Sequence, residues 1–421
     1  MESFTPNEFT VAFLVALALA TATRLWLALR QVGHVHRHRD SVPESFASTI
    51  TLPAHQKAAD YSIAKTRLGI ADVALGVAVL LLLTLGGGLE GLSGLWARSL
   101  DPAGYWHGVA LAMSLVLLLS IIDLPLTLYR TFVVEAKFGF NRMTLRLFLI
   151  DLAKQTVLGA ALGVPLLLLV LWLMARMGEM WWLYVWLAWM GFNLLILMLY
   201  PTFIAPFFNR FTPLSDPSLT ERIGQLLSRC GFKAQGLYVM DGSKRSSHGN
   251  AYFTGFGAAK RIVLFDTLLT RLAPAEVEAV LAHELGHFKR HHVWKRVAIL
   301  FTMSLGMLWV LGRLIGEAWL YEGLNVHSQG TAMGLVLFFL VVPVFTFFLQ
   351  PLTSLYSRKH EFEADAYAAL HANPNDLVHA LVKLYQDNAA TLTPDPLHSA
   401  FYDSHPPAAT RIARLQQAAP A

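Results

Sequence analysis

Charged residues are scarce in this chain of 421 residues. Only 14% are Asp, Glu, Lys or Arg, whereas 55% are hydrophobic, and the mean hydropathy is +0.48. Soluble globular proteins carry about 25% charged residues. The low charge therefore argues against a soluble protein and predicts a polytopic membrane protein. For such a protein, the length divided by a typical domain size does not give the number of domains.

Cysteine is almost absent as well. Cys230 is the single cysteine, which excludes an intrachain disulfide and a zinc site built from several thiolates. We expect its thiol to be buried and inert. The net charge of +5 does not indicate nucleic-acid binding, because no nucleic-acid motif accompanies it. Basic loops that face an anionic lipid surface explain the charge more simply.

Long apolar runs are abundant, and seven of them approach or exceed the roughly 20 residues that cross a bilayer. Glu2 and Glu8 precede the first run, which favours a retained span over a cleaved signal peptide, although the small residues at Ala18–Thr23 leave cleavage open. The predicted spans are about 9–29, 68–89, 109–129, 157–177, 181–207, 297–320 and 333–352.

The spans divide the chain into four parts. We expect spans one to five in 1–207, a polar cytoplasmic region in 208–292 that contains the His283–His287 stretch described below, spans six and seven in 293–355, and a cytoplasmic tail in 356–421. Lys and Arg gather after the odd-numbered spans. The positive-inside rule then puts the N-terminus outside and both polar regions in the cytoplasm.

Several ionisable side chains lie within or beside the apolar runs, namely Asp72, Asp123, Asp151 and Lys154. Such residues face a bundle interior or a watery cavity, or else sit near an interface. Asp151 and Lys154 are three residues apart and can pair on one helix face. In the loop expected after the first span, three histidines alternate with other residues; they can bind metal, but a solvated basic loop is the simpler interpretation. These are His34, His36 and His38.

The metal-binding signal is the pentapeptide His283–His287, an H-E-x-x-H pattern. Pro274, Glu276 and Glu278 before it predict the start of a helix. On a helix, His283 and His287 leave one face and can bind a single Zn²⁺. Glu284 then lies where it can act as general base toward a water activated by the metal.

A zinc hydrolase needs a third protein ligand, and Glu361 is the best candidate. Asp365 follows four residues later on the same helical face and can accept a hydrogen bond from a ligand histidine. Glu363 lies about 200° away around the helix, so we expect it to be solvated. His360 is an alternative ligand that lacks the paired aspartate.

The region before the motif contains a small amount of strand. Leu237–Met240 is expected to be a strand, and Asn250–Phe256 with Arg261–Phe265 a hairpin around Gly257–Ala259. An exposed sheet edge can hold an extended peptide through main-chain hydrogen bonds. The candidates for that edge are Asn250, Ala251, Tyr252 and Phe253, although a purely structural hairpin fits the sequence almost as well.

One more histidine, His405, precedes two prolines. Near a metal it can donate a hydrogen bond to a developing oxyanion, and otherwise it is a loop residue before a turn.

Taken together, these motifs resemble the type I CaaX prenyl endopeptidases, which are integral-membrane zinc metalloproteases with a gluzincin-like pattern. The resemblance covers nearly the whole chain. Besides the two zinc motifs it rests on Phe138–Asn141, Phe208–Leu214, Ser247–Gly255 and Ser404–Pro407.

The resemblance implies seven transmembrane helices around a large water-filled chamber, with a mostly α-helical catalytic region near the cytoplasmic side. It implies one Zn²⁺ per chain on His283, His287 and Glu361, with Glu284 as the base. It also implies active-site roles for His405, Asn250 and Arg411, in substrate positioning and oxyanion support. Such a chamber makes the acidic residues at membrane depth candidate wall residues; these are Asp72, Asp123 and Asp151.

The implied substrates are prenylated CaaX proteins, from which the family removes a carboxyl-terminal tripeptide; some members also cut a second, internal site. The compact chain and the absence of a di-lysine signal at Gln416–Ala421 favour a bacterial member in the inner membrane. A bacterium can lack prenylated proteins, so fold and chemistry carry over better than the native substrate. Nothing in the sequence indicates an oligomeric state.

Two other functions compete with this interpretation. Membrane heat-shock proteases that degrade misfolded membrane proteins share both zinc motifs, but they usually have fewer spans. A transporter with a structural zinc would also suit intramembrane acids. Structural zinc, however, usually takes four protein ligands, and the sequence pairs only three convincingly.

Overall fold

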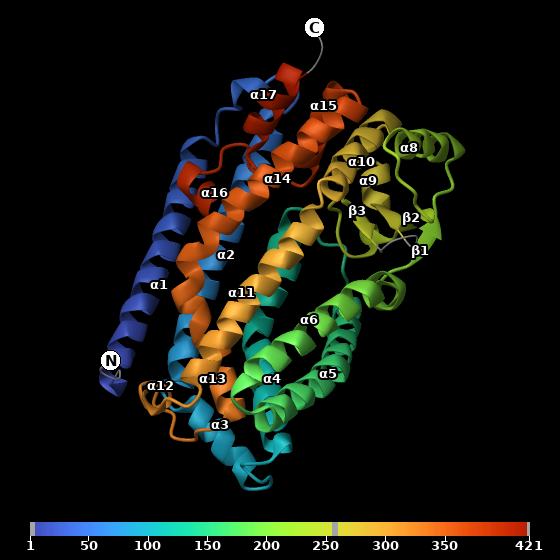
Figure 1. The fold of residues 1–421 in the computed structure, drawn as a ribbon. Coiled ribbons are helices and arrows are strands. Elements are labelled where there is room, and N and C mark those ends of the chain that lie inside the picture. Colours follow the sequence, from blue (N-terminus) through green and yellow to red (C-terminus); the bar gives the residue numbers. More distant parts are fainter. Residues whose placement is uncertain (1–4, 255–259, 419–421) are drawn as a thin grey trace.

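The computed structural model describes residues 5–254 and 260–418. In this part of the chain, seven helical stretches are long and apolar enough to cross a membrane, which confirms the predicted multi-pass architecture. In Figure 1 the long helices run along the length of the molecule, with the N-terminus at one end and the small sheet and C-terminal helices toward the other. The stretches are Pro6–Arg37, Leu52–Leu83, Tyr105–Glu135, Leu145–Arg176, Gly178–Phe208, His292–Leu314 and Thr331–His371.

The helices of these stretches are α1 (Pro6–Arg37), α2 (Leu52–Leu83), α4 (Tyr105–Tyr129), α5 (Leu145–Arg176), α6 (Trp181–Leu199), α7 (Ala205–Phe208), α11 (His292–Leu314), α13 (Thr331–Thr346) and α14 (Gln350–His371). Between α2 and α4 lies α3 (Gly88–Ala97), and between α11 and α13 lies α12 (Ala318–Glu322). Single turns of 3₁₀- or π-helix cover Glu44–Phe46, Arg130–Glu135, Gly178–Met180, Tyr200–Ile204 and Phe347–Leu349.

Several helices extend beyond the apolar runs that predicted them. His34 and His36 lie in the last turn of α1, and His38 is its C-cap, so the expectation of a basic loop there was wrong. Lys57 likewise belongs to α2, which begins after the N-cap Thr51. Straight-chain basic residues are good helix formers, and so helices continue past the membrane core into polar sequence.

The predicted pairing of Asp151 with Lys154 was wrong. Asp151 is buried and accepts two hydrogen bonds from Arg245, at 2.8 and 3.0 Å. Lys154 instead donates to the carbonyl oxygen of Phe207 at 2.7 Å. The planar guanidinium of Arg245 fits a carboxylate with two parallel bonds, which an ammonium one helical turn away cannot do.

The other intramembrane acids have different surroundings. Asp123 accepts a hydrogen bond from Thr127 on its own helix, at 2.7 Å. Asp72 lines a cavity of about 400 Å³ between α1, α2, α4 and α13, together with Arg24. These local surroundings do not test the large water-filled chamber implied by the resemblance, so the chamber remains a prediction.

The polar region that follows α7, predicted to be catalytic, is built around a four-stranded mixed sheet in the order β1-β2-β4-β3. β2 pairs in parallel with β4, whereas β1 and β3 pair antiparallel with their neighbours. β3 is therefore an edge strand, as a peptide-binding strand requires. The turn predicted at Gly257–Ala259 lies outside the described residues. The strands are β1 (Phe211–Pro213), β2 (Gly236–Met240), β3 (Ala251–Thr254) and β4 (Arg261–Phe265).

Helices pack against this sheet and against α14. A buried hydrophobic cluster joins them, and it includes Ile223 of α8, Ile262 of β4 and Leu285 of α10. Cys230 is buried in the same cluster, as predicted. The helices are α8 (Pro217–Arg229), α9 (Asp266–Leu269), α10 (Pro274–Lys289), α15 (Pro374–Asp387), α16 (Pro396–Tyr402) and α17 (Ala408–Ala418), with a 3₁₀ turn at Gly242–Lys244.

Candidate metal centre

The helix α10 carries the H-E-x-x-H motif and begins at Pro274, as the sequence predicted. Glu276 fixes its first turn by accepting a hydrogen bond from the backbone N–H of Ala273 at 2.7 Å. One helical turn separates His283 from His287, so their rings lie on one face and their Nε2 atoms are 3.2 Å apart.

Glu361 on α14 completes a group of three. Its carboxylate oxygens lie 3.5 Å from Nε2 of His283 and 3.3 Å from Nε2 of His287. Within the described residues, this is the cluster of His and acidic side chains close enough to hold one ion. His360, the alternative ligand, is not part of it; its ring stacks on His292 at 3.9 Å.

The donor set fits a zinc ion. A tetrahedral ion with bonds of roughly 2.0–2.1 Å separates its ligand atoms by about 3.3 Å. The two Nε2 atoms are 3.2 Å apart, close to that value, and each lies within 3.5 Å of one of the two carboxylate oxygens of Glu361, so the three side chains converge on one point. In addition, Oε2 of Glu361 is buried without a hydrogen-bond partner, a cost that a cation would remove.

Asp365 supports His283 from behind. Its Oδ1 lies 2.8 Å from Nδ1 of His283, on the side of the ring away from the ligand nitrogen. Arg411 of α17 donates two hydrogen bonds to Asp365, at 2.8 and 2.6 Å, and all three side chains are buried. Arg411 thus contacts Asp365 directly and also lines the cavity beside the metal centre, and its predicted role in substrate positioning remains a prediction.

The carboxylates around His283 change its proton affinity. Burial lowers the pKa of His283, but its hydrogen bonds to Asp365 and Glu361 outweigh that effect and raise the pKa to about 9. A ligand histidine must be neutral, so metal binding at this position releases a proton.

His287 has a support that the sequence did not reveal. Its Nδ1 lies 2.9 Å from Nδ1 of His292, whose Nε2 lies 2.9 Å from Oε2 of Glu363. The expectation that Glu363 is solvated was therefore wrong. The chain reverses at His291, which has a left-handed φ of 56°, and this turn brings His292 back beside His287. No helical or strand periodicity in the sequence predicts such a contact.

Glu284 faces a cavity of about 250 Å³ beside the three ligands. Burial raises the pKa of Glu284, which suits a general base that works near neutral pH. Asn250, Ala251, Tyr385 and His405 line the same cavity. The structure thus gathers the base, the candidate strand and the candidate oxyanion histidine around one space.

His405 lies 3.5 Å from Glu361, measured from its Nε2 to Oε1. Its side chain is 61% accessible and lines two cavities of the described structure. The surrounding protein atoms lower the pKa of His405 by desolvation, so the neutral ring is favoured near pH 7. A neutral imidazole can still donate one hydrogen bond to a substrate oxygen.

The predicted substrate strand is only partly turned toward the cavity. Asn250 and Ala251 line it, whereas Tyr252 does not, because successive strand residues point to opposite faces. The ring of Tyr252 instead packs edge-on against Phe265, with centroids 6.2 Å apart. A role for Tyr252 through its main chain remains a prediction.

Tyr385 of α15 is a site residue that the sequence analysis missed. It lines the cavity with Glu284, and burial raises the pKa of its hydroxyl. In the sequence it looks like any core aromatic residue of an amphipathic helix, so no pattern marked it.

Two family descriptions match the chain in succession. Residues 31–210 match "CAAX prenyl protease N-terminal, five membrane helices", and residues 213–419 match "Peptidase family M48". Among curated proteins, the CAAX prenyl protease 1 homolog of Arabidopsis thaliana is 39% identical over 323 residues, which is 74% of each chain. The CAAX prenyl protease 1 homolog of Homo sapiens is 32% identical over 456 residues, covering 96% of this chain and 95% of that protein.

A solved structure has the same fold over nearly the full length. The crystal structure of S. mikatae Ste24p superposes with a TM-score of 0.88 at 30% sequence identity. The match covers 96% of this chain and 98% of that one.

Proposed function

This chain belongs to peptidase family M48 and is a multi-pass membrane metalloendopeptidase, and from that premise we propose that it is a zinc enzyme that cleaves near the carboxyl terminus of CaaX-type proteins. The observation that supports the zinc assignment is the convergence of His283, His287 and Glu361, whose ligand atoms lie close enough together to hold one ion. The names of the relatives carry the substrate class.

The chemistry divides between the ion and the protein. Bound zinc supplies Lewis acidity, which polarises the scissile carbonyl and lowers the pKa of water. Glu284 takes a proton from the attacking water and passes it to the leaving amine. Asp365 fixes the tautomer and orientation of His283, and Arg411 fixes Asp365.

Two further groups act on the substrate itself. His405 lies at the cavity wall across from α10, where its ring can donate to the oxyanion of the tetrahedral intermediate. The edge strand β3 offers free main-chain groups to an extended peptide, and Asn250 stands at its entrance. We assign Asn250, Ala251 and Tyr252 to substrate binding on this ground.

We further propose that the metal centre faces the cytoplasm, with the N-terminus outside. Lys and Arg are concentrated in the segments after the odd-numbered spans, and those segments include the catalytic region. A cytoplasmic site would also meet lipid-modified proteins where they are made.

Peptide cleavage by detergent-purified protein tests the proposal. Farnesylated CaaX peptides and the same peptides without the lipid are assayed as substrates in parallel. Release of the carboxyl-terminal tripeptide is measured by mass spectrometry. We expect release that stops with a chelator, returns with Zn²⁺ and is absent in Glu284→Ala. Release of no tripeptide by metal-replete wild-type protein would contradict the CaaX assignment, and degradation of unfolded membrane proteins in its place would favour quality control.

A transporter with a structural zinc no longer fits this chain. Residues 213–419 match a peptidase family, and the ion-binding group has three protein ligands next to a cavity. Structural zinc sites are usually closed by four protein ligands, whereas catalytic sites keep one position open.

A further inference from the structure

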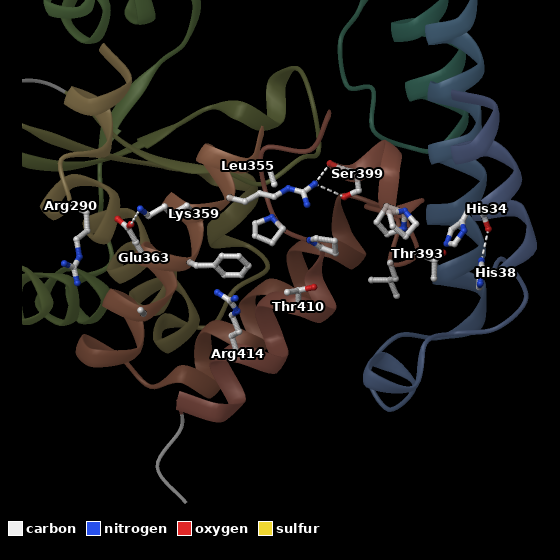
Figure 2. Close-up of a pocket in the computed structure, with 18 of the residues that line it drawn as sticks. His34, His38, Arg290, Leu355, Lys359, Glu363, Thr393, Ser399, Thr410 and Arg414 are labelled. Atoms are coloured by element: carbon white, nitrogen blue, oxygen red, sulfur yellow. Dashed lines mark hydrogen bonds and ion pairs between the residues drawn. The ribbon is translucent and has the colours of Figure 1, made fainter. Parts of the chain in front are cut away.

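A second cleft lies on the face of α14 and α17 opposite the metal centre. Glu361 and Asp365 of α14 and Arg411 of α17 point toward the ligands, whereas Phe362 of α14 and Arg414 of α17 line the cleft. Its volume is about 1250 Å³, larger than the roughly 300–1,000 Å³ of ordinary small-molecule pockets. Figure 2 shows Arg290, Lys359, Glu363 and Arg414 on one side of this cleft and His34 and His38 of α1 on the other.

The cleft carries an excess of positive charge. Five cations line it, whereas Glu363 is the single carboxylate among the described residues of its wall; the cations are Arg290, Lys295, Arg358, Lys359 and Arg414. Lys295 and Lys359 lie 3.9 and 4.0 Å from Glu363, which is also held by His292.

Three of the five cations have no carboxylate partner in the described chain, and one of them, Arg358, donates instead to the carbonyl oxygens of Ser399 and Asp403. No carboxylate lies within 4.0 Å of Arg290 or Arg414 there, and the guanidinium of Arg414 stacks on the ring of Phe362 at 3.7 Å. The stacking holds the guanidinium in place while leaving its N–H edge able to donate. The cleft is therefore suited to an anion.

The surrounding helices place these cations at the depth of lipid headgroups. On α14, Leu352 and Leu355 are 63% and 56% exposed, and Lys359 follows one turn later on the same face. Exposed leucines of that kind on a membrane protein face acyl chains, so the change from leucine to lysine marks the edge of the hydrocarbon.

The exposed face of α11 also changes between basic and apolar residues, but here the basic residue comes first along the chain. Lys295 lies in its first turn, and Ile299 and Met303 follow at intervals of four residues, 40% and 43% exposed. Both helices therefore cross from apolar to basic at the level of the cleft. A soluble anion would not need exposed apolar side chains next to its binding site. A phospholipid would, because its acyl chains pack against them.

We propose that this cleft binds the headgroup phosphate of an anionic phospholipid from the leaflet on the catalytic side. Lys359 and Arg414 supply the donors to the phosphate, and the acyl chains run along Leu352 and Leu355. Basic pockets between transmembrane helices on the cytoplasmic side suit anionic headgroups, and each basic side chain adds to the attraction. The two donors to the phosphate, Lys359 and Arg414, are not among the residues assigned to peptide hydrolysis, so lipid binding is tested independently of the proposed function. Glu363 of the cleft wall is shared, because it also supports His287 through His292.

Native mass spectrometry of the full chain in detergent micelles tests this site. Phosphatidylglycerol and phosphatidylcholine with the same acyl chains are titrated separately. We expect wild-type protein to retain phosphatidylglycerol selectively and the double variant Lys359→Gln/Arg414→Gln to retain it at least tenfold more weakly, with phosphatidylcholine unchanged. The matched control is Arg142→Gln/Arg146→Gln, which removes two exposed cations before and within the first turn of α5 and should leave retention unchanged.

Three results would overturn the proposal. They are equal retention of the two lipids by wild-type protein, equal loss in the cleft and control variants, and displacement of the lipid by inorganic phosphate at equal concentration, which would indicate a free-anion site. The variant Lys359→Arg/Arg414→Lys should restore selectivity. If the glutamine variant fails to fold, the single variant Lys359→Glu takes its place in the titration, because the Lys359 side chain is 71% exposed and its replacement should not disturb the fold. It should likewise retain phosphatidylglycerol more weakly than wild-type protein.

Discussion

At the scale of single residues, the metal centre is organised by pairs in which one partner orients the other. Asp365 orients His283, Arg411 orients Asp365, and His292 with Glu363 orients His287. Each ligand histidine therefore has its second nitrogen engaged, which fixes the tautomer that presents Nε2 to the ion. The orphaned oxygen of Glu361 is the remaining unsatisfied group of this set.

Replacing Glu284 by glutamine separates chemistry from metal binding. The amide keeps the shape of the side chain but cannot accept a proton, and removal of a general base typically costs between 10² and 10⁴ in rate. We expect kcat to fall by about 10³ while the zinc content, measured by mass spectrometry of the metal, stays at one per chain. Substantial activity in a metal-replete Glu284→Gln preparation would rule out this residue as the base.

Replacing His292 by glutamine tests the support behind His287. Loss of a partner in contact with a ligand typically weakens metal affinity by 10- to 100-fold. We expect a drop of about tenfold in zinc affinity, measured by competition with a chelator, together with a smaller loss of activity at saturating zinc. His379→Gln is the control, because His379 is exposed on α15. An unchanged affinity in His292→Gln would show that His287 needs no such partner.

The grouping of the candidate ligands could be predicted from sequence, but part of the contacts behind them could not. His283, His287, Glu361 and Asp365 each follow from a spacing of four on a helix, which is a local rule. His292 and Glu363 meet through a left-handed turn at His291 and a contact between helices 71 residues apart in sequence. Such contacts depend on the tertiary fold, and so they cannot be predicted from the spacing of residues in one sequence.

At the scale of elements, the site depends on the close approach of α10 and α14. A Cβ added to Gly286 would lie 2.9 Å from Cα and 3.0 Å from the carbonyl oxygen of Ala364. Since these are backbone atoms of α14, they cannot move aside without moving the helix that carries Glu361. The glycine of the motif is thus needed for helix packing, whatever its role toward substrate.

The substitution Gly286→Ala should therefore separate the two halves of the site. Overpacking of this kind typically costs 1–3 kcal/mol. We expect thermal stability in detergent to fall and zinc affinity to fall with it, because Glu361 moves away from the two histidines. The control is Gly224→Ala on α8, where a Cβ meets nothing within 4 Å and the helix should be unharmed or slightly stabilised. Equal behaviour of the two variants would contradict this account.

The number of membrane helices was predictable, whereas their lengths were not. Hydropathy marks the part of a helix that lies in hydrocarbon, and all seven runs appeared. It gives no sign of the polar turns that continue α1 to Arg37 or α14 to His371. These extensions matter because the third ligand, Glu361, lies on one of them.

At the scale of the whole molecule, one arginine ties the membrane helices to the catalytic region. Arg245, just after the Gly242–Lys244 turn, bonds to Asp151 of α5, to the side chain of Asn209 and to the carbonyl oxygen of Phe208. Asn209 and Phe208 belong to the segment that leaves the fifth span. This largely buried cluster is therefore one of the points that join the membrane bundle to the sheet; the backbone pairing of Ser246 with Asn141 is another.

Replacing Arg245 by glutamine should loosen that junction. Removing one partner of a buried ion pair typically costs 3–5 kcal/mol, because the other charge is left uncompensated. We expect a lower melting temperature and lower peptidase activity in Arg245→Gln, and partial recovery in Arg245→Gln/Asp151→Asn, which removes the stranded carboxylate. A single variant as stable as wild-type protein would show that the junction does not depend on this pair.

The orientation of the whole molecule in the membrane can be tested with introduced thiols, because Cys230 is the one native cysteine and is buried. In a Cys230→Ala background, Ala103→Cys reports on the segment before the third span and Asn375→Cys on α15; both positions are exposed. The proposed orientation follows the positive-inside rule and puts the segments after the odd-numbered spans on the cytoplasmic side. A membrane-impermeant maleimide should therefore label Ala103→Cys in intact cells and Asn375→Cys only after permeabilisation. The reverse pattern would put the metal centre outside the cytoplasm and remove the argument that it meets its substrates there.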